Sequence, residues 1–456
     1  MTPGSSARAT AGRAVQFALL AALFAGCAPR AGGAPDGPLN VVVVLVDTLR
    51  ADRLSLYGYQ RETSPNIDRF AAERGVVFRH AWANAGCTYP SVNSLLTGRQ
   101  PQRILARMAE VGLAIPPEMP TLAERFAAAG WSTGAISASS VVRATPSKVN
   151  RQGGFDRGFG FFDESCHERG AACVNGRATA ALDRLPEPFL LYLHYLDPHS
   201  PYRPPEWAER PYSAASASAA RGWARRGEPW KIQRKLYRGE TGNEFGPGDV
   251  RHLADLYDDE IRYFDARFAE LLAEMERRGL RERTILAFVS DHGEELFEHG
   301  HWAHCGDLAF ETVLATPFVL AVPGLPAGER RAPVSNVDLA PTLLELAGIG
   351  ADPELFDGAS LAPLLRSGTD GDAARVVFAA QGRMRAARDR HRRVTLDLAS
   401  GEFAGEELGD FAAGGTTAEL ARALSAWLRE VEGSDGDVAL RDAERIDAEL
   451  RAVGYL

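Results

Sequence analysis

The chain of 456 residues has a formal net charge of −9, and 45% of its residues are hydrophobic and 24% are charged. These values are typical of a globular protein, and the length allows a large core with a smaller appended unit. Because the net charge is negative and the composition is not basic, we expect no nucleic-acid partner.

The N-terminus has the pattern of a signal peptide. Arg8 and Arg13 precede an apolar run over residues 14–26, which is shorter than the roughly 20 residues that a bilayer-spanning helix needs. We therefore expect residues 1–27 to direct export. Residues 23–27, Leu-Phe-Ala-Gly-Cys, resemble a bacterial lipoprotein box. This predicts an acylated Cys27 that anchors the protein on the periplasmic side of a membrane, with residues 28–38 as a tether. Ordinary cleavage before Cys27, with secretion or release into the periplasm, is the alternative.

Three continuous apolar runs predict central strands of a parallel sheet. They cover residues 40–46, 189–196 and 284–290. The polar segments that follow them are Asp47-Thr48, Asp197-Pro198-His199 and Asp291-His292-Gly293-Glu294. Ligands of open α/β sheets bind beyond the carboxyl ends of the strands, so these segments predict one shared site.

Helical patterns lie between and after these runs. Apolar residues recur at helical spacing over 253–271, and residues 121–129 predict a helix that ends at Gly130. This alternation is typical of an α/β fold. Residues 213–238, with an Ala/Ser tract and a basic cluster, predict a surface excursion.

A smaller unit is expected after the main domain. An Asp- and Gly-rich stretch at 367–372 divides a main domain, residues 39–370, from a C-terminal subdomain, residues 371–456. Strand patterns at 376–378 and 393–396, followed by a helix, predict an α+β subdomain. The apolar residues of that helix are Leu420, Leu424, Trp427 and Leu428.

Residues 88–99, Thr-Tyr-Pro-Ser-Val-Asn-Ser-Leu-Leu-Thr-Gly-Arg, predict the start of a helix near Thr88. Thr is a good N-cap and Pro fits a first turn, so Thr88 can be interpreted as a helix cap alone. A hydroxyl at a helix N-terminus also lies where the backbone favours an anion.

Several short motifs, in this order, resemble those of the sulfatase family in the alkaline phosphatase superfamily. They are residues 47–52, 63–68, 88–99, 197–202, 290–294, 337–342 and 450–455. The resemblance implies an alkaline-phosphatase-like fold, in which a mixed, mostly parallel sheet is sandwiched by helices. It makes residues 39–370 a sulfatase-like catalytic domain.

Carried over residue by residue, the resemblance implies that Asp47, Asp291 and His292 bind a metal and that Thr88 is both ligand and nucleophile. A Thr hydroxyl is a poor nucleophile until a cation lowers its pKa. These donor types suit one divalent ion of Mn, Mg, Ca or Zn. Taken singly, either Asp could instead be a loop or helix cap.

Two histidines complete the site that the resemblance implies. His199 would contact the ester oxygens or protonate the leaving group, although a His beside Pro can also be a plain turn residue. His304 falls near the position of an active-site Lys of sulfatases. A second metal is the alternative, bound by Asp197 with His299, His301 and His304.

The nucleophile separates two branches of the family. In the family motif, the nucleophile precedes Leu-Thr-Gly-Arg by a fixed number of residues, and from residues 96–99 this spacing places Thr88 at the nucleophile position. Sulfatases have at that position a Cys, which is converted to formylglycine within a Cys-x-Pro-x-Arg motif. Cys87 has Tyr89 at the Pro position. None of the three lysines lies in a motif that matches the sulfate-binding lysines. A threonyl ester must be attacked by water or another alcohol. Phosphate and phosphonate esters are therefore expected as substrates in addition to sulfate esters.

The expected function is thus metal-dependent hydrolysis of a small, glycan-linked or lipid-linked anionic ester. The alternatives are a formylglycine sulfatase that uses Cys87, a phosphoalcohol headgroup transferase, and an inactive anion-binding protein. Export permits disulfides. Cys166 and Cys173 can close a short loop, while Cys87 and Cys305 can pair with each other or remain free.

Overall fold

The computed structural model describes Met1 and residues 37–107, 112–167, 170–226, 245–350, 352–408 and 417–431. The expected signal peptide with Cys27, most of the tether, and the motif at 450–455 lie outside the described residues. Within these ranges, no helix combines the length and the apolar character that crossing a membrane requires.

A sheet of eight strands forms the centre of the molecule, in the order β11-β2-β10-β7-β1-β6-β4-β5. Strand β10 runs antiparallel to both of its neighbours, and the other neighbouring pairs are parallel. The expected mixed, mostly parallel sheet is confirmed. Its strands are β1 Asn40–Val46, β2 Gly75–Phe78, β4 Ser132–Ser137, β5 Phe161–Asp163, β6 Phe189–Tyr195, β7 Thr284–Ser290, β10 Phe318–Ala321 and β11 Gly328–Arg330.

Strand β1 is buried on both faces. Val42, Val44 and Val46 pack into one hydrophobic cluster, while the side chains that alternate with them pack into another. This explains why the sequence of β1 is apolar throughout. Strands β6 and β7 flank β1 in parallel, and Val46 is in register with Tyr195 and Ser290. The three strands therefore end side by side.

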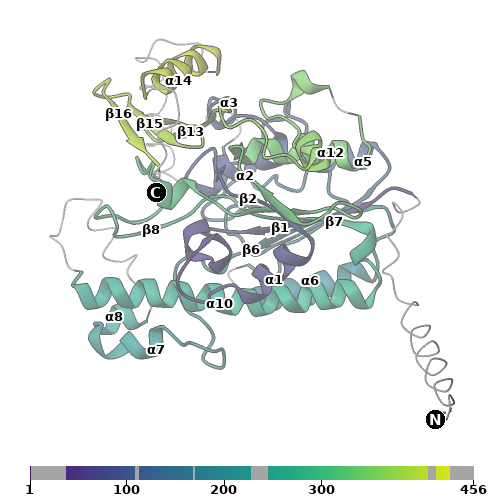
Figure 1. Cartoon of the computed structure of the whole chain (residues 1–456), viewed down its shortest axis with the longest axis horizontal. Coiled ribbons are helices and arrows are strands. Elements are labelled where there is room, and N and C mark those ends of the chain that lie inside the picture. Colours follow the sequence, from purple (N-terminus) through teal and green to yellow (C-terminus); the bar gives the residue numbers. More distant parts are fainter. Residues whose placement is uncertain are drawn as a thin grey trace.

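Helices cover both faces of the sheet (Figure 1). One face carries α1 Pro65–Arg74, α6 Ala171–Leu182 and α10 Pro247–Arg277. The other carries α2 Thr88–Thr97, α3 Pro101–Leu105, α5 Leu122–Ala128, α12 Leu339–Leu346 and α13 Ala362–Ser367. Helix α5 begins with a capping box of Thr121 and Glu124, and α10 extends beyond the predicted 253–271 at both ends.

Short elements connect these layers. The two-stranded pairs are β3 Ala81–Trp82 with β12 Val334–Ser335, and β8 Glu295–Leu296 with β9 Trp302–Ala303. The short helices are α7 Ser213–Ser216, α8 Gly222–Arg225 and α11 Glu311–Leu314. The 3-10 turns are η1 Ala51–Arg53, η2 Ser55–Tyr57, η3 Ala217–Ala219, η4 Arg281–Arg283, η5 Asn336–Asp338 and η6 Pro353–Leu355.

The described part of the predicted surface excursion, residues 213–226, is docked on α10. The Ser213 amide donates to Asp259 Oδ2 at 2.8 Å, and Ser216 Oγ lies 2.8 Å from His252 Nδ1. Both serines are buried. Most of the other residues of this part are exposed or half-buried. The segment therefore runs over the surface as expected, and the two serines hold it to the helix.

A small antiparallel sheet with one helix follows the main sheet. Its elements are β13 Val377–Gln381, β14 Met384–Arg388, β15 Arg392–Asp397, β16 Phe403–Glu407 and α14 Thr417–Val431. The predicted apolar face of the helix packs on Val394 and Leu396 of this sheet. The smaller α+β subdomain expected from the sequence is confirmed.

Candidate active site

Asp47 follows β1, and Asp291 and His292 follow β7, so neighbouring strands deliver three polar side chains to one edge of the sheet. All three residues are buried. His292 Nε2 lies 3.8 Å from Asp47 Oδ1 and 3.4 Å from Asp291 Oδ2. One ligand atom from each residue lies within 4.8 Å of the others. The structure thus brings together Asp47, Asp291 and His292, which are three of the four predicted metal ligands; the fourth is Thr88.

The loops that carry these residues are tied to one another. The Leu49 amide donates to Ser290 Oγ at 3.0 Å, and Arg50 Nη1 donates to the Glu294 carbonyl at 2.9 Å. A Cβ at Gly293 would lie 2.1 Å from the Thr312 carbonyl oxygen, so only Gly fits there. These contacts fix the ends of β1 and β7 relative to each other.

Each carboxylate uses one oxygen for hydrogen bonds and leaves the other without a partner. Asp47 Oδ2 accepts from His194 Nε2 at 3.1 Å, while Asp291 Oδ1 accepts from the amides of Thr48 and His292 at 3.2 and 2.9 Å. Asp47 Oδ1 and Asp291 Oδ2 are buried with no hydrogen-bond partner. Burying such atoms is costly unless a cation pairs with them, so this donor set fits a divalent metal.

His292 is also oriented to bind a cation. Its Nδ1 lies 2.9 Å from the Gly293 carbonyl oxygen, to which it donates. Nε2 then carries the lone pair, and it lies near both unpartnered carboxylate oxygens. Metal-bound histidines are commonly oriented in this way.

The electrostatics of the cluster favour a bound cation. Burial, together with the charge of Asp47, raises the pKa of Asp291 to about 7. Burial acts in the same direction on Asp47, but the hydrogen bond from His194 and the fields of His199, His194 and His292 hold its pKa well below the usual range. Burial lowers the pKa of His292. A divalent ion would offset the repulsion between the two carboxylates.

Thr88 is the first residue of α2, and Cys87 is the N-cap residue. The Thr88 hydroxyl makes no cap hydrogen bond to the backbone; its oxygen lies 3.2 Å from His292 Nε2. Ser91, one turn along α2, donates to the Asp291 carbonyl at 2.6 Å and holds the helix against the end of β7. The interpretation of Thr88 as the cap is therefore wrong.

His199 and His304 lie beside this cluster. The ring centroid of His304 lies 4.5 Å from that of His292 and 5.1 Å from that of His199. His304 Nδ1 lies 2.9 Å from Glu294 Oε1, and the other Glu294 oxygen accepts from the Tyr202 hydroxyl at 2.7 Å. The buried Glu294 thereby fixes the orientation of His304.

The structure does not gather the alternative second metal site. His299 Nδ1 contacts Glu295 Oε1 at 3.0 Å and stacks on Phe310. Asp197 pairs instead with Glu260 in the core. Across the described ranges, Asp47, Asp291 and His292 are the one group of at least three His, Cys, Asp or Glu side chains with metal-binding spacing.

Both cysteine pairs form disulfides, Cys87 with Cys305 and Cys166 with Cys173. The first joins the residue before Thr88 to the residue after His304. Gln381 of β13 braces the same junction: its side chain accepts from the Gly86 amide at 2.7 Å and donates to the Gly306 carbonyl at 2.9 Å. The small subdomain therefore contacts the loops of the candidate site.

Sequence analysis did not identify the residues behind the site. His194 and Tyr192 lie inside the apolar run of β6, and Tyr192 Oη is 2.8 Å from His194 Nδ1. A histidine in the middle of a buried strand needs a polar partner, and this was the available signal. Nothing in the sequence reveals that the partner is Asp47.

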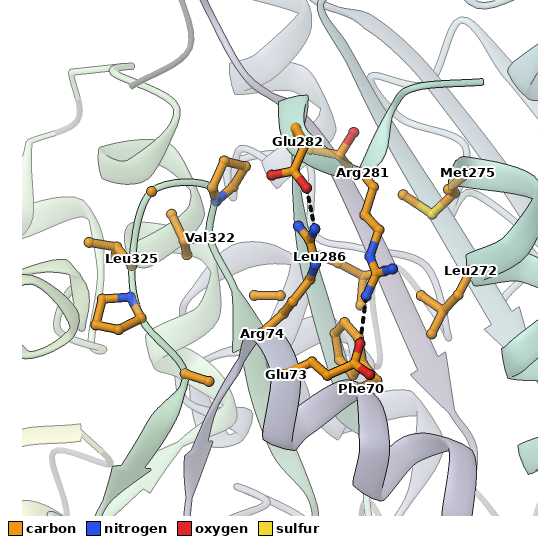
Figure 2. Close-up of a pocket in the computed structure, with 16 residues that line it drawn as sticks. Phe70, Glu73, Arg74, Leu272, Met275, Arg281, Glu282, Leu286, Val322 and Leu325 are labelled. Carbon is orange, nitrogen blue, oxygen red and sulfur yellow. Dashed lines mark hydrogen bonds and ion pairs between the residues drawn. The ribbon is translucent and has the colours of Figure 1, made fainter. Parts of the chain in front are cut away.

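A separate cavity of about 250 Å³ lies at the opposite end of β7 (Figure 2). Two ion pairs, Arg74 with Glu282 and Arg281 with Glu73, cross it above apolar side chains. It holds none of the candidate site residues.

Residues 39–349 match the family described as Sulfatase. The chain belongs to the sulfatase family. It is 35% identical to choline-sulfatase of Rhizobium meliloti over 119 residues, which are 26% of this chain and 23% of that relative. It is 28% identical to arylsulfatase A of Bos taurus over 360 residues, covering 74% of this chain and 69% of the relative.

Solved structures agree with this family at the level of the fold. A protein in complex with its substrate D-glucosamine-2-N,6-O-disulfate has a TM-score of 0.66 at 18% identity, covering 88% of this chain and 99% of the other. A phosphonate monoester hydrolase of Silicibacter pomeroyi has a TM-score of 0.62 at 17% identity, covering 88% and 96%. The sulfatase-family chain is a hydrolase of ester bonds with the alkaline-phosphatase-like fold.

Proposed function

We propose that this sulfatase-family hydrolase uses the Thr88 hydroxyl as its nucleophile, in a metal-dependent cleavage of phosphate, phosphonate or sulfate esters. The observation that carries the proposal is the 3.2 Å approach of Thr88 Oγ1 to His292 Nε2, next to the unpartnered oxygens of Asp47 and Asp291. A structural threonine at a helix start has no need of this position.

The metal would be held by Asp47, Asp291, His292 and Thr88. When bound, it would lower the pKa of the Thr88 hydroxyl and neutralise charge on the ester. The chain's own contribution is to bury these donors, to leave one oxygen of each Asp without a hydrogen-bond partner, and to bring one ligand atom of Asp47, Asp291 and His292 within 4.8 Å of one another.

The reaction then proceeds by two displacements. Thr88 gives up its hydroxyl proton to solvent, and its Oγ bonds to the central sulfur or phosphorus atom. The bond to the alcohol oxygen breaks, and that oxygen receives a proton from His199 or His304. Water next attacks the same central atom and gives up a proton to the histidine that protonated the alcohol, while the Thr88 oxygen leaves and takes up a proton from solvent. The two histidines lie together beside His292, which supports their role in proton transfer.

The disulfide between Cys87 and Cys305 supports Thr88 over the formylglycine alternative. A cysteine whose sulfur is bonded to another sulfur is not available for conversion to formylglycine. Peptide mass spectrometry of the oxidised protein tests this point: linked peptides that contain Cys87 and Cys305 are expected, and formylglycine at position 87 would contradict the proposal.

The substrate class is proposed as a small, glycan-linked or lipid-linked anionic ester. Choline-sulfatase and arylsulfatase A among the relatives favour sulfate esters, and the phosphonate monoester hydrolase favours phosphorus esters. A panel of aryl sulfate, phosphate monoester, phosphate diester and phosphonate monoester substrates, offered to the metal-loaded protein with and without glycerol, separates these classes. Cleavage of none of them would refute the function, and faster leaving-group release with glycerol would indicate transfer.

We also propose that the protein is exported and anchored through Cys27. The two disulfides support an oxidising compartment. Cys27→Ser should move the enzyme from the membrane fraction to the soluble fraction of its host cell, while an unchanged distribution would argue against the lipid anchor.

A further inference from the structure

A groove of about 920 Å³ lies at the edge of the main sheet, where β4 and β5 begin. The end of α6 forms one wall, and the segments before β4 and β5 form the other. The lining is mostly apolar, and its large apolar side chains are half-buried: Trp131, Phe159, Phe161 and Leu185. The groove holds none of the candidate site residues. Its size is at the upper end of the range for sites that take small molecules.

The charged residues that line the groove are two arginines and one aspartate, so the groove is positive. Arg177 of α6 is about half exposed, and its Nε lies 3.6 Å from Asp163 Oδ2. Arg184, just after α6, is exposed, and no residue that the structure describes pairs with its guanidinium. A free guanidinium beside an apolar surface suits a ligand with an anionic head and an apolar body.

The chain enters the described structure beside this groove. Trp131 Nε1 donates to the Leu39 carbonyl at 3.2 Å, which holds the residue before β1 at the rim of the groove. Leu39 follows Cys27, the expected site of acylation, by 12 residues. A chain of this length spans at most about 40 Å. In the anchored protein, the groove is therefore within reach of the membrane surface.

The candidate active site lies at the opposite edge of the sheet. Asp47 and Asp291 follow the carboxyl ends of their strands, whereas the groove lies at the amino ends of β4 and β5, and these four strands run parallel. At about 3.3 Å per residue, the length of β1 separates the two edges by about 20 Å. Figure 1 shows α5, which leads into β4, and β8, which follows β7, at opposite sides of the sheet. A groove in contact with the membrane would turn the active site toward the aqueous side.

We propose that the groove binds an anionic phospholipid of the membrane that carries the protein. An acyl chain lies against the apolar side chains, and Arg184, supported by Arg177, binds the phosphate. Arginine can bind phosphate through two parallel N–H donors, and tryptophan is enriched at membrane interfaces, as Trp131 would be here. This inference rests on the proposed export and lipid anchor and extends them. It orients the enzyme, and it assigns to it esters of the aqueous compartment rather than esters within its own membrane.

Vesicle binding tests the inference. All proteins carry Cys27→Ser, so that no acyl chain attaches them, and each is sedimented with vesicles of phosphatidylcholine alone or mixed with phosphatidylglycerol. The mixed vesicles should bind more protein. Arg184→Ala should weaken this binding about fivefold, the effect of losing one arginine near an anionic surface. Ala180→Glu, which adds a carboxylate at an exposed position of the groove, should weaken it at least as much.

Arg251→Ala is the matched control for charge. Arg251 is an exposed arginine of α10 outside the groove, and its Nε lies 3.9 Å from Asp255 Oδ2, a distance similar to that between Arg177 and Asp163. Its loss changes the net charge as Arg184→Ala does, and vesicle binding should stay unchanged. Because residues 180, 184 and 251 are all exposed, the variants should fold, and thermal melts check this.

Brominated phosphatidylglycerol reports contact with the groove itself. Bromine on the acyl chain quenches the fluorescence of a tryptophan that it touches, so mixed vesicles made with this lipid should quench the protein. Trp131→Phe should remove most of the quenching. Trp427→Phe, in α14 of the small subdomain, should retain it.

The inference is overturned if the mixed vesicles bind no more protein than phosphatidylcholine vesicles, if Arg184→Ala and Arg251→Ala weaken binding equally, or if Trp131→Phe keeps the quenching. A dimer in solution that Ala180→Glu dissociates would assign the groove to a second copy of the chain and would also overturn it.

Ester cleavage separates this inference from the proposed function. Arg184→Ala and Ala180→Glu should cleave a soluble ester as the parent protein does. Vesicle binding that depends on the groove, in a protein that cleaves no ester of the panel, refutes the function and leaves the inference standing. A wild type with unmodified Cys27 refutes the anchor, while loss of vesicle binding in the groove variants still supports the lipid site.

Discussion

Thr88 and His292 come from different layers of the fold, yet their side-chain heteroatoms approach to 3.2 Å. Three restraints produce this contact: the start of α2 at Thr88, the hydrogen bond from Ser91 to the Asp291 carbonyl, and the orientation of His292 by Gly293. At the scale of single residues, the proposed chemistry depends on this one hydroxyl.

Thr88→Ala should therefore abolish ester cleavage. Removing a nucleophile typically costs on the order of 10⁴-fold or more in turnover, whereas Thr88→Ser keeps a hydroxyl and should retain measurable activity. Steady-state kinetics with the preferred ester measure both. Thr97→Ala is the control, because Thr97 lies in the same helix and its hydroxyl donates to the Asn93 carbonyl, away from the site. Equal losses in Thr88→Ala and Thr97→Ala would indicate a defect of α2 instead.

The buried pair of Asp197 and Glu260 should make stability depend on pH. Burial raises the pKa of Asp197 from 3.8 to about 6, and burial with the charge of Asp197 raises that of Glu260. Between about pH 4 and 6 the folded state binds more protons than the unfolded state, so stability falls as the pH rises. Glu260→Gln should flatten this decline by up to about 1.4 kcal/mol per pH unit.

Urea unfolding of the wild type and of Glu260→Gln across this pH range measures the difference. Glu276→Gln, which changes an exposed carboxylate near the end of the same helix, should leave the profile unchanged. Parallel profiles for wild type and Glu260→Gln would show that the pair does not titrate within the fold.

At the scale of elements, the sequence predicts the parts of the site that are local. Strands β1, β6 and β7 can be predicted because burial on both faces requires a continuous apolar run. Asp47 and Asp291 can be predicted as site residues because they follow such runs directly. Contacts between distant segments are not encoded in any local pattern. The partnership of His194 with Asp47 spans 147 positions and that of Cys87 with Cys305 spans 218. Both depend on which strands become neighbours.

The disulfide of Cys87 and Cys305 links two elements that carry proposed catalytic residues. Replacing both cysteines by serine should lower both activity and stability, because Thr88 and His304 lose a common anchor and a long loop is opened. The expected loss of unfolding free energy is about 2–5 kcal/mol. Kinetics and urea unfolding of the double variant measure the two effects.

Serine replacement of Cys166 and Cys173 provides the comparison. This disulfide closes a loop of sequence separation 7, so its removal should cost less stability. The bond joins the segment before α6 to the first turn of that helix and does not lie beside Thr88, so activity should be retained. Full activity of the Cys87/Cys305 variant would show that the bond does not position the site.

At the scale of the whole molecule, the proposed metal joins β1, β7 and α2, so its removal should weaken the entire catalytic domain. A ligand at about 100 times its Kd stabilises a fold by about 2.7 kcal/mol. Chelation should therefore lower the melting temperature of the wild type. Asp291→Asn, which removes the negative charge of one proposed ligand, should show a smaller shift on chelation. Identical melting with and without chelator would contradict a structural link through the metal.

The claim that a threonine hydroxyl performs the chemistry is tested most directly by trapping the covalent intermediate. The metal-loaded wild type is mixed with the ester that it cleaves best, quenched in acid during turnover, and digested for peptide mass spectrometry. The account predicts a sulfuryl or phosphoryl group on Thr88, with Cys87 still linked to Cys305. Formylglycine at position 87, with Thr88 unmodified, would contradict it.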